Sequence, residues 1–123
     1  MEPIVLVVDD ESSVRTLIAS ALREHGYRTV EAADGTTALR LIKELRPAAV
    51  VLDVELPNLY GTSVLHAIRG HKQLASVPII GMSGYEIDPA DERSFTCFLQ
   101  KPFSPSDVVF VLAQVAPLPS TAG

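Results

Sequence analysis

The sequence predicts an α/β protein built on a doubly wound parallel sheet of five strands, with helices on both faces. Five short apolar runs alternate with segments that repeat apolar residues at helical spacing. Continuous apolar strands that alternate with helices are typical of a parallel sheet covered on both faces. The 123 residues suffice for one hydrophobic core. We therefore expect a single domain over residues 1–116 and a flexible C-terminal tail over residues 117–123.

The five strands are marked by apolar runs between turn residues. We expect them at residues 4–8, 27–32, 48–52, 78–82 and 96–99. Connections through helices are compatible with the sheet order 2-1-3-4-5, in which the winding reverses between the first and third strands. Ligands of such sheets collect beyond the carboxyl ends of these two strands, so the functional site is expected at that edge.

The helices are marked by apolar periodicity together with capping residues. Ser12 or Ser13 is expected to open the first helix, which Gly26 closes. Ser104 and Pro105 predict the N-cap and the first turn of the last helix. The remaining boundaries are set by turn and breaker residues, namely Asp34 and Gly35 before the second helix, Pro47 after it, Gly61 before the third and Pro117 after the last.

Acidic residues gather where these strands end. Asp9 and Asp10 follow the run at 4–8, Asp53 follows the run at 48–52, and Ser83 and Lys101 follow the last two runs. Three carboxylates within about 4 Å of one another repel by roughly 4 kcal/mol per pair at an effective dielectric of about 20, so the site holds protons or a cation. Oxygen ligands favour a hard cation such as Mg²⁺, whose open positions accept phosphoryl oxygens. The pattern therefore predicts phosphoryl chemistry on a carboxylate.

Composition limits the classes of partner. Fifteen acidic residues against 10 basic ones give a net charge of −5, which argues against sequence-independent binding to nucleic acid or to an anionic membrane. No apolar run approaches the roughly 20 residues that span a bilayer, and the start MEPIVLVVDD lacks the basic region of a signal peptide. The single cysteine, Cys97, fits a reducing compartment. We expect a cytoplasmic chain with protein partners, and neither nucleic-acid nor membrane contact.

Four motifs follow one another in a specific order and spacing. They are VLVVDDE at residues 5–11, VVLDVELPNLYG at 50–61, GMSGY at 81–85 and LQKPF at 99–103. Together they resemble the receiver domain of two-component response regulators, of the single-domain, chemotaxis-regulator-like kind. The resemblance implies a flavodoxin-like fold and a signalling protein whose surface changes when it accepts a phosphoryl group from a sensor histidine kinase or a histidine phosphotransfer protein. It implies that the protein is not an enzyme in the usual sense, because it would catalyse only its own phosphoryl transfer and dephosphorylation.

The resemblance also implies which residues bind the metal and accept the phosphoryl group. Asp53 would be the phosphoacceptor. Mg²⁺ would be held by Asp10, by Asp53 and by the backbone carbonyl of Glu55, while Asp9 would hold a metal-bound water. Lys101 would pair with the phosphoryl oxygens.

Two further residues are implied to form a switch. Ser83 would hydrogen-bond the phosphoryl oxygens, and Phe98 stands where the family places an aromatic side chain whose rotamer follows the residue at position 83. The peptide between Lys101 and Pro102 is a candidate cis bond, because cis peptides are essentially confined to X-Pro.

The segment between Ser83 and Lys101 departs from the family pattern. It is about four residues shorter than is typical, which is about one helical turn. Asp88 and Pro89 predict the N-cap and first residue of a fourth helix that reaches only about residue 95. We expect this helix to be short or irregular, so the family's usual output surface does not carry over directly.

Two alternative functions fit parts of the pattern. A small Mg²⁺-dependent phosphohydrolase of the haloacid-dehalogenase type would also use an aspartate nucleophile, and Asp53, Glu55, Ser83 and Lys101 superficially imitate its set. Those enzymes place a second aspartate two residues after the nucleophile, whereas here the acidic pair precedes it. The other alternative, a receiver-like interaction module that is never phosphorylated, is opposed by the full set of pocket residues. Cognate kinase, output partner and oligomeric state leave no signature in the sequence.

Overall fold

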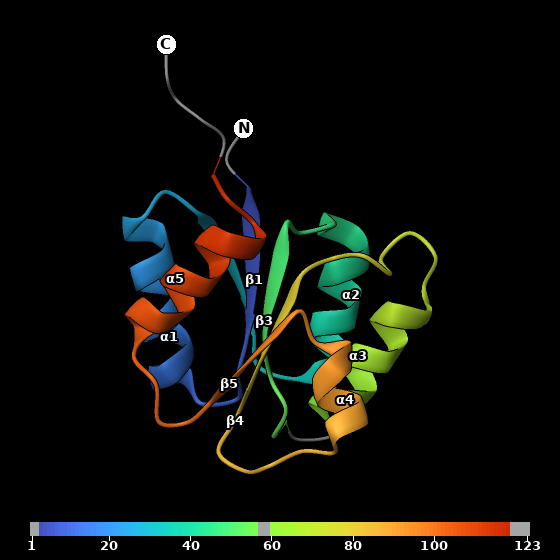
Figure 1. The fold of residues 1–123 in the computed structure, drawn as a ribbon. Coiled ribbons are helices and arrows are strands. Elements are labelled where there is room, and N and C mark those ends of the chain that lie inside the picture. The colour runs from blue at the N-terminus through green and yellow to red at the C-terminus, as the bar shows by residue number, and fades with distance from the viewer. Residues whose placement is uncertain (1–2, 57–59, 119–123) are drawn as a thin grey trace.

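The chain folds into a sheet of five parallel strands between two layers of helices (Figure 1). In the computed structural model the described residues are 3–56 and 60–118. The strand order is β2-β1-β3-β4-β5, which confirms the predicted doubly wound sheet. The elements are β1 (Ile4–Val8), α1 (Ser12–Glu24), β2 (Arg28–Ala32), α2 (Gly35–Leu45), β3 (Ala49–Asp53), α3 (Gly61–Gly70), β4 (Ile79–Ser83), α4 (Pro89–Ser94), β5 (Cys97–Gln100) and α5 (Pro105–Val115).

Each face of the sheet has its own helices. α1 and α5 lie on one face, and α2, α3 and α4 lie on the other (Figure 1). Because successive strand residues point to opposite faces, Val5 and Val7 of β1 pack in the core beneath α1 and α5, whereas Leu6 and Val8 pack in the core beneath α2 and α3. All five residues of β3 are buried. β1 and β3 are thus fixed by packing on both faces of the sheet.

Three strands end one residue later than their apolar runs predict. β3 ends at Asp53, β4 at Ser83 and β5 at Gln100. The ladder continues through these polar residues, since Asp53 is paired with Met82 and Ser83 with Gln100. Strand pairing uses backbone groups, so it does not stop where the last apolar side chain stops. Asp53 and Ser83 are therefore the last residues of buried strands rather than loop residues.

The helix boundaries follow the predicted caps, except at α1. Asp34 accepts a hydrogen bond from Thr37 N at the start of α2, and Ser104 caps α5. At α1 the N-cap residue is Glu11 instead of one of the two predicted serines, and its side chain makes no capping hydrogen bond. Its backbone N–H instead donates to the carboxylate of Asp9. Sequence periodicity alone does not reveal this preference, because it depends on where the strand places Asp9.

The fourth helix is short, as predicted. α4 has six residues, none of them buried, and Asp88 accepts a hydrogen bond from Ala90 N at its start. Phe95, directly after the helix, is buried over β4. A Cβ atom at Gly81 would lie 2.7 Å from the Phe95 ring, so only glycine leaves room for this side chain. α4 is therefore anchored by the residue that follows it.

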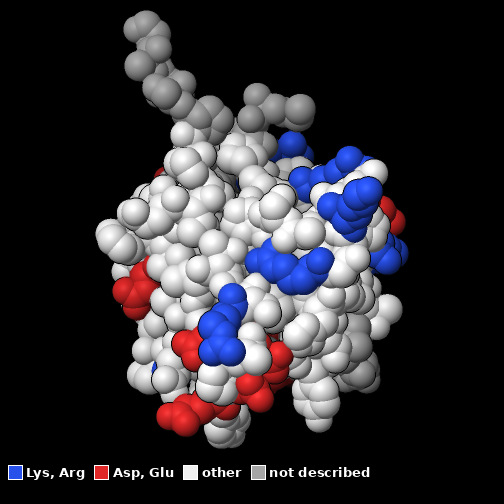
Figure 2. Space-filling model, turned by 45° about the vertical axis from the view of Figure 1, so that its right-hand side comes forward, with Lys and Arg blue, Asp and Glu red and all other residues white. Residues whose placement is uncertain are grey.

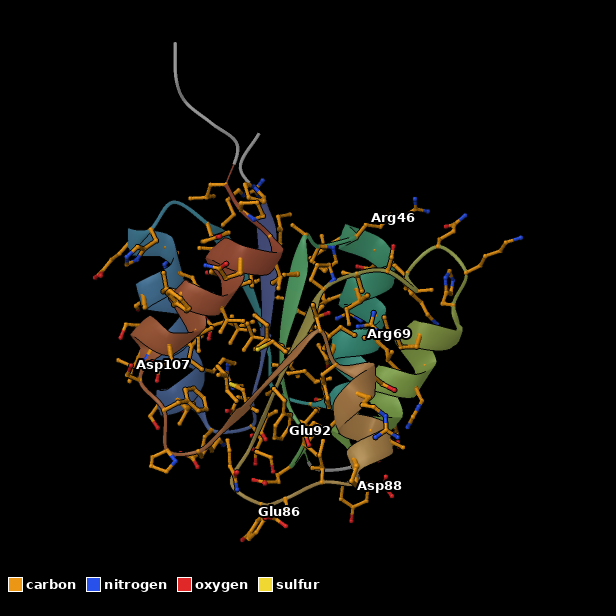
Figure 3. All side chains as sticks on the ribbon, in the orientation of Figure 1. Arg46, Arg69, Glu86, Asp88, Glu92 and Asp107 are labelled. Carbon is orange, nitrogen blue, oxygen red and sulfur yellow. The ribbon has the colours of Figure 1, made fainter. Side chains whose placement is uncertain are left out.

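Charge is divided over the face that carries α3 and α4. Acidic residues gather near the edge where the strands end, and most Lys and Arg residues lie toward the opposite edge (Figure 2). Glu86, Asp88 and Glu92 lie near α4 at the acidic edge, whereas Arg46 and Arg69 lie farther from that edge (Figure 3). An acidic edge raises the local concentration of cations.

Two predictions about the chain ends and membranes can be placed. Residues 119–123 of the expected tail lie outside the described residues. Within residues 3–56 and 60–118, no helix is long and apolar enough to cross a membrane.

Candidate functional site

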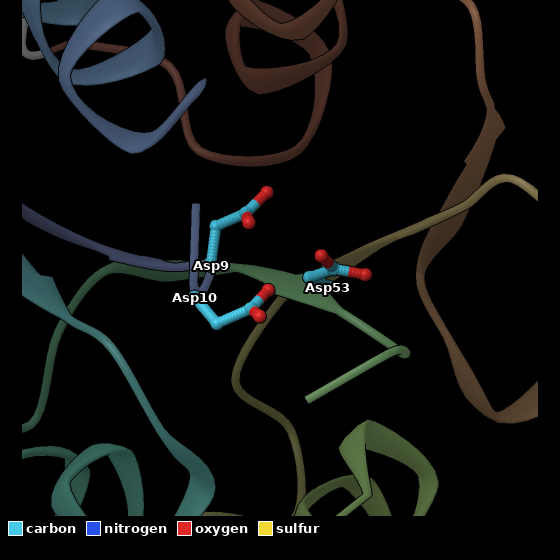
Figure 4. A group of neighbouring side chains, drawn as sticks. All are labelled: Asp9, Asp10 and Asp53. Carbon is cyan, nitrogen blue, oxygen red and sulfur yellow. The ribbon is translucent and has the colours of Figure 1, made fainter. Parts of the chain in front are cut away.

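Three carboxylates meet where β1 and β3 end. Asp9 and Asp10 directly follow β1, and Asp53 is the last residue of β3, the strand that pairs with β1 (Figure 4). One carboxylate oxygen from each residue lies within 4.8 Å of the others. Asp9 and Asp53 are buried, while Asp10 is exposed. The sequence-predicted acidic group therefore forms, with an open side at Asp10.

Backbone amides orient the two buried carboxylates. Glu11 N donates to Asp9 Oδ1 at 2.9 Å, and Glu55 N donates to Asp53 Oδ1 at 2.9 Å. Each amide lies two residues after its aspartate, as in an Asx-turn. The second oxygen of each aspartate is thereby directed into the site.

Lys101 faces these second oxygens. Its Nζ lies 3.4 Å from Asp53 Oδ2 and 4.0 Å from Asp9 Oδ2. Its backbone is held at the sheet edge because Lys101 N donates to Ser83 O at 2.7 Å. The peptide bond to Pro102 is cis, as expected from the sequence. The ammonium thus shares the site with the three carboxylates.

Burial and neighbouring charges change the pKa values of these groups. Burial raises the pKa of Asp9, and the negative charge of Asp53 raises it further. The hydrogen bond from Glu11 lowers it in part, and the resulting pKa is about 6. Burial alone would lower the pKa of Lys101, but the carboxylates of Asp53 and Asp9 outweigh this and raise it above its usual value. The site therefore gathers three acidic groups around a single ammonium, so acidic groups outnumber basic ones.

The donor set fits a hard divalent cation. Asp9 Oδ2 is buried without a hydrogen-bond partner, which is costly unless another group satisfies it. The three aspartates supply only oxygen ligands, which suit Mg²⁺ rather than softer metals. A hydrated ion at this position would supply Asp9 Oδ2 with a hydrogen-bond partner and reduce the repulsion among the carboxylates.

Gly61 lets α3 begin directly against the phosphoacceptor candidate. A Cβ atom at this position would collide with the backbone of Asp53 and Val54. Gly61 N also donates to Val54 O at 2.9 Å, which ties the start of α3 to the end of β3. The glycine that sequence reasoning used only as a helix boundary therefore also shapes the site.

Ser83 lies beside the acidic group, but its hydroxyl is used elsewhere. Ser83 Oγ donates to Glu55 Oε1 at 2.5 Å and accepts from Tyr85 N at 3.0 Å. The resemblance to receiver domains implies only a backbone role for Glu55, so it does not predict this side-chain contact. No local pattern signals it, because it joins the segment after β3 to the last residue of β4, 28 residues away.

Phe98 lies on β5, which pairs with β4, the strand that ends at Ser83. It is half-buried and packs against Phe95, with ring centroids 5.6 Å apart and the planes tilted by 47°. Phe98 is also paired with Gly81 of β4, two residues before Ser83. The two residues of the predicted switch, Ser83 and Phe98, therefore lie on neighbouring strands.

Comparison with known proteins identifies the family. The family model described as the response regulator receiver domain matches residues 5–113. The chemotaxis response regulator CheY4 of Vibrio cholerae has a similar structure, with a TM-score of 0.84 at 30% identity over 94% of this chain and 99% of that one. The chain belongs to the response regulator receiver domain family, and its class is that of a signalling protein.

Another structural relative was solved with a bound metal ion. The receiver domain of sensor histidine kinase PA1611 from Pseudomonas aeruginosa was solved with a magnesium ion in its active-site cleft. It has a TM-score of 0.82 and 29% identity, over 94% of this chain and 98% of that one.

The curated relatives are longer than this chain. The DNA-binding response regulator MtrA of Mycolicibacterium paratuberculosis is 34% identical over 110 residues, which is 85% of this chain and 47% of the relative. The regulator PhoP of Bacillus subtilis is 36% identical over 106 residues, 44% of its length. The chain thus spans about half the length of these relatives. The expectation of no nucleic-acid contact concerns these 123 residues and stays a prediction.

Proposed function

We propose that Asp53 accepts the phosphoryl group by which this receiver domain signals. The observation that carries the proposal is the position of the Asp53 carboxylate. One oxygen is fixed by Glu55 N, and the other faces the ammonium of Lys101 at 3.4 Å. A carboxylate held this way has one oxygen free to attack and a cation beside it to neutralise the incoming charge.

The chain's own residues supply positioning and charge. An Asp53 oxygen forms the new P–O bond while the bond from phosphorus to the donor breaks, and Lys101 pairs with the phosphoryl oxygens. Asp10, Asp53 and the backbone carbonyl of Glu55 would hold Mg²⁺, with Asp9 acting through a water. The ion would supply positive charge that neutralises the same oxygens. We propose a histidine kinase or a histidine phosphotransfer protein as the donor, and the cytoplasm as the place of transfer.

The catalytic scope of the chain is proposed to be narrow. It would promote its own phosphorylation and dephosphorylation and turn over no separate substrate. The relatives reported above are response regulators and receiver domains, which gives the haloacid-dehalogenase alternative no support. A protein that hydrolyses a simple phosphate ester with many turnovers would reopen that alternative.

Labelling with a small phosphodonor tests the assignment. Incubation with acetyl phosphate and Mg²⁺ is expected to add one phosphoryl group, detected by intact mass, and Asp53→Ala is expected to abolish it. Asp34→Asn is the matched control, since Asp34 is a capping residue at the start of α2 and asparagine also caps helices well. Equal labelling of the parent and Asp53→Ala would show that Asp53 is not the acceptor, and no labelling of the parent would favour the unphosphorylated module.

A further inference from the structure

The side chain of Glu55 ties two segments of the site together. Its Oε1 accepts a hydrogen bond from Ser83 Oγ at 2.5 Å and a second from Gly84 N at 2.9 Å. Its own backbone N–H donates to Asp53 Oδ1. One residue therefore orients the phosphoacceptor candidate through its amide and holds the end of β4 through its carboxylate.

The backbone around Ser83 is fixed, but its hydroxyl can turn. Ser83 is paired with Gln100 in the sheet, and its carbonyl accepts from Lys101 N. The preceding residue, Met82, is paired with Asp53. The hydroxyl of Ser83 therefore stays near Asp53 in any state that preserves the sheet, and the question is only which acceptor it serves.

A serine hydroxyl has a single proton and donates to one strong acceptor at a time. In this structure that acceptor is the Glu55 carboxylate, and the Gly84 amide serves the same oxygen. Hydrogen bonds to a carboxylate are charge-assisted and are stronger than those between neutral groups. A phosphoryl group on Asp53 would have to take these donors from Glu55.

We propose that the Glu55 carboxylate is an internal stand-in for the phosphoryl group, holding the Ser83 hydroxyl and the Gly84 amide until phosphorylation displaces it. The proposal rests on Asp53 being the phosphoacceptor. The Glu55 carboxylate in this way opposes activation of the unphosphorylated protein, and the bound phosphoryl group must replace two hydrogen bonds that already exist.

Charge and space both favour the displacement. A phosphoryl group adds close to two negative charges at neutral pH and repels a neighbouring carboxylate. Glu55 lines an open cavity of about 520 Å³ that continues past Tyr60, Tyr85 and Ile87. The released side chain can move into this cavity without disturbing the core, while its backbone N–H keeps its hydrogen bond to Asp53.

The first test reads the contact in metal-free protein. Glu55→Ala is expected to shift the amide resonances of Gly84 and Tyr85 and to speed the hydrogen exchange of the Gly84 amide. Glu55→Gln keeps an acceptor oxygen and is expected to keep most of that protection. Glu86→Ala is the matched control, because it removes a carboxylate from the same cavity wall without a hydrogen bond to Ser83.

The second test measures competition with a mimic of the phosphoryl group. Beryllofluoride with Mg²⁺ is expected to bind Glu55→Ala about tenfold more tightly than the parent, as expected from the loss of one competing charge-assisted contact. Glu55→Gln should fall between them. If Glu55→Ala binds no more tightly than Glu86→Ala, the stand-in role is wrong, while acetyl phosphate labelling of Asp53 in both variants would leave the proposed function intact. No labelling and no beryllofluoride binding in any variant would overturn both.

Discussion

The acidic pocket and α4 lie at the same edge of the sheet, but the fold holds them in opposite ways. Asp9 and Asp53 extend from strands that are packed on both faces, and the two residues are 0% and 2% exposed. α4 contributes no buried residue at all. The pocket is therefore held firmly although its carboxylates repel one another, whereas α4 has no such repulsion and is attached by few contacts.

Three contacts attach α4 to the rest of the domain. Phe95 fills the space above Gly81, Arg69 Nε donates to Ser94 O at 3.0 Å, and His66 Nε2 lies 2.8 Å from Asp91 Oδ1. Each comes from a residue that flanks or faces the helix, because the helix has no apolar stripe of its own. A helix held this way can change its order without disturbing the core. The firmly held acidic pocket thus suits a chemical reaction, whereas the loosely held α4 suits a conformational response to it.

The largest expected effect is at the Phe95 contact. Phe95→Ala should lower the free energy of unfolding by about 3 kcal/mol, because it removes a buried aromatic ring and leaves a cavity over β4. Hydrogen exchange in α4 should rise more than in α1. Phe110→Ala is the control, since Phe110 is 68% exposed and its loss should change stability by less than about 0.5 kcal/mol. Equal losses in the two variants would mean that Phe95 does not anchor α4.

The second prediction concerns Asp9, whose carboxylate is destabilised by burial and, to a smaller extent, by the charge of Asp53. Asp9 has a pKa of about 6 in the folded protein against 3.8 ordinarily, so the folded state binds its proton more tightly than the unfolded state does. The stability that this provides is present below pH 3.8 and is lost as the pH rises through about 6. Without metal, Asp9→Asn should therefore match the parent near pH 4 and exceed it by about 2 kcal/mol at pH 7.

Denaturant unfolding across this pH range, in the presence of a chelator, measures the difference. Asp34→Asn is the control, because the hydrogen bond from Thr37 lowers the pKa of Asp34 and no gain at neutral pH is expected. Mg²⁺ should stabilise the parent by about 2.7 kcal/mol at one hundred times its dissociation constant, and should stabilise Asp9→Asn less. A parent whose unfolding is indifferent to Mg²⁺, or a variant without a gain at pH 7, would contradict the strained pocket.

The smallest effect is expected at Arg69. Its guanidinium donates to three backbone carbonyls, those of Ala75, Val77 and Ser94. Arg69→Lys keeps the charge but cannot form this fork, so it should cost about 1 kcal/mol and loosen the C-terminal end of α4. Hydrogen exchange of residues 85–95, with and without beryllofluoride, measures the loosening. These amides should exchange fast in the free protein and slow on activation, and strong protection before activation would show that α4 is as firmly held as the pocket.

Much of the site could be predicted from the sequence, because each residue follows a strand whose direction is known. The ends of parallel strands share one edge, so Asp9 and Asp53, at the ends of the adjacent strands β1 and β3, had to lie close together once the strand order was correct. Lys101 follows β5, two strands from β3, and its long side chain spans that gap. Ser83 lies at the predicted edge, but its hydrogen bond to Glu55 was not predicted. The direction of a side chain depends on neighbours that arrive from elsewhere in the chain, and no periodicity encodes them.

The sequence by itself determined the alternation of parallel strands and helices, the acidic residues at the strand ends and the short fourth helix. These depend on apolar periodicity, on turn and capping residues and on chain length, all of which are local. Only the tertiary structure decided that Asp9 Oδ2 has no hydrogen-bond partner, that the Glu55 side chain binds Ser83, and that the Phe95 ring lies over Gly81. Each of these depends on packing between segments distant in sequence, where burial and a neighbour's position decide which contact forms.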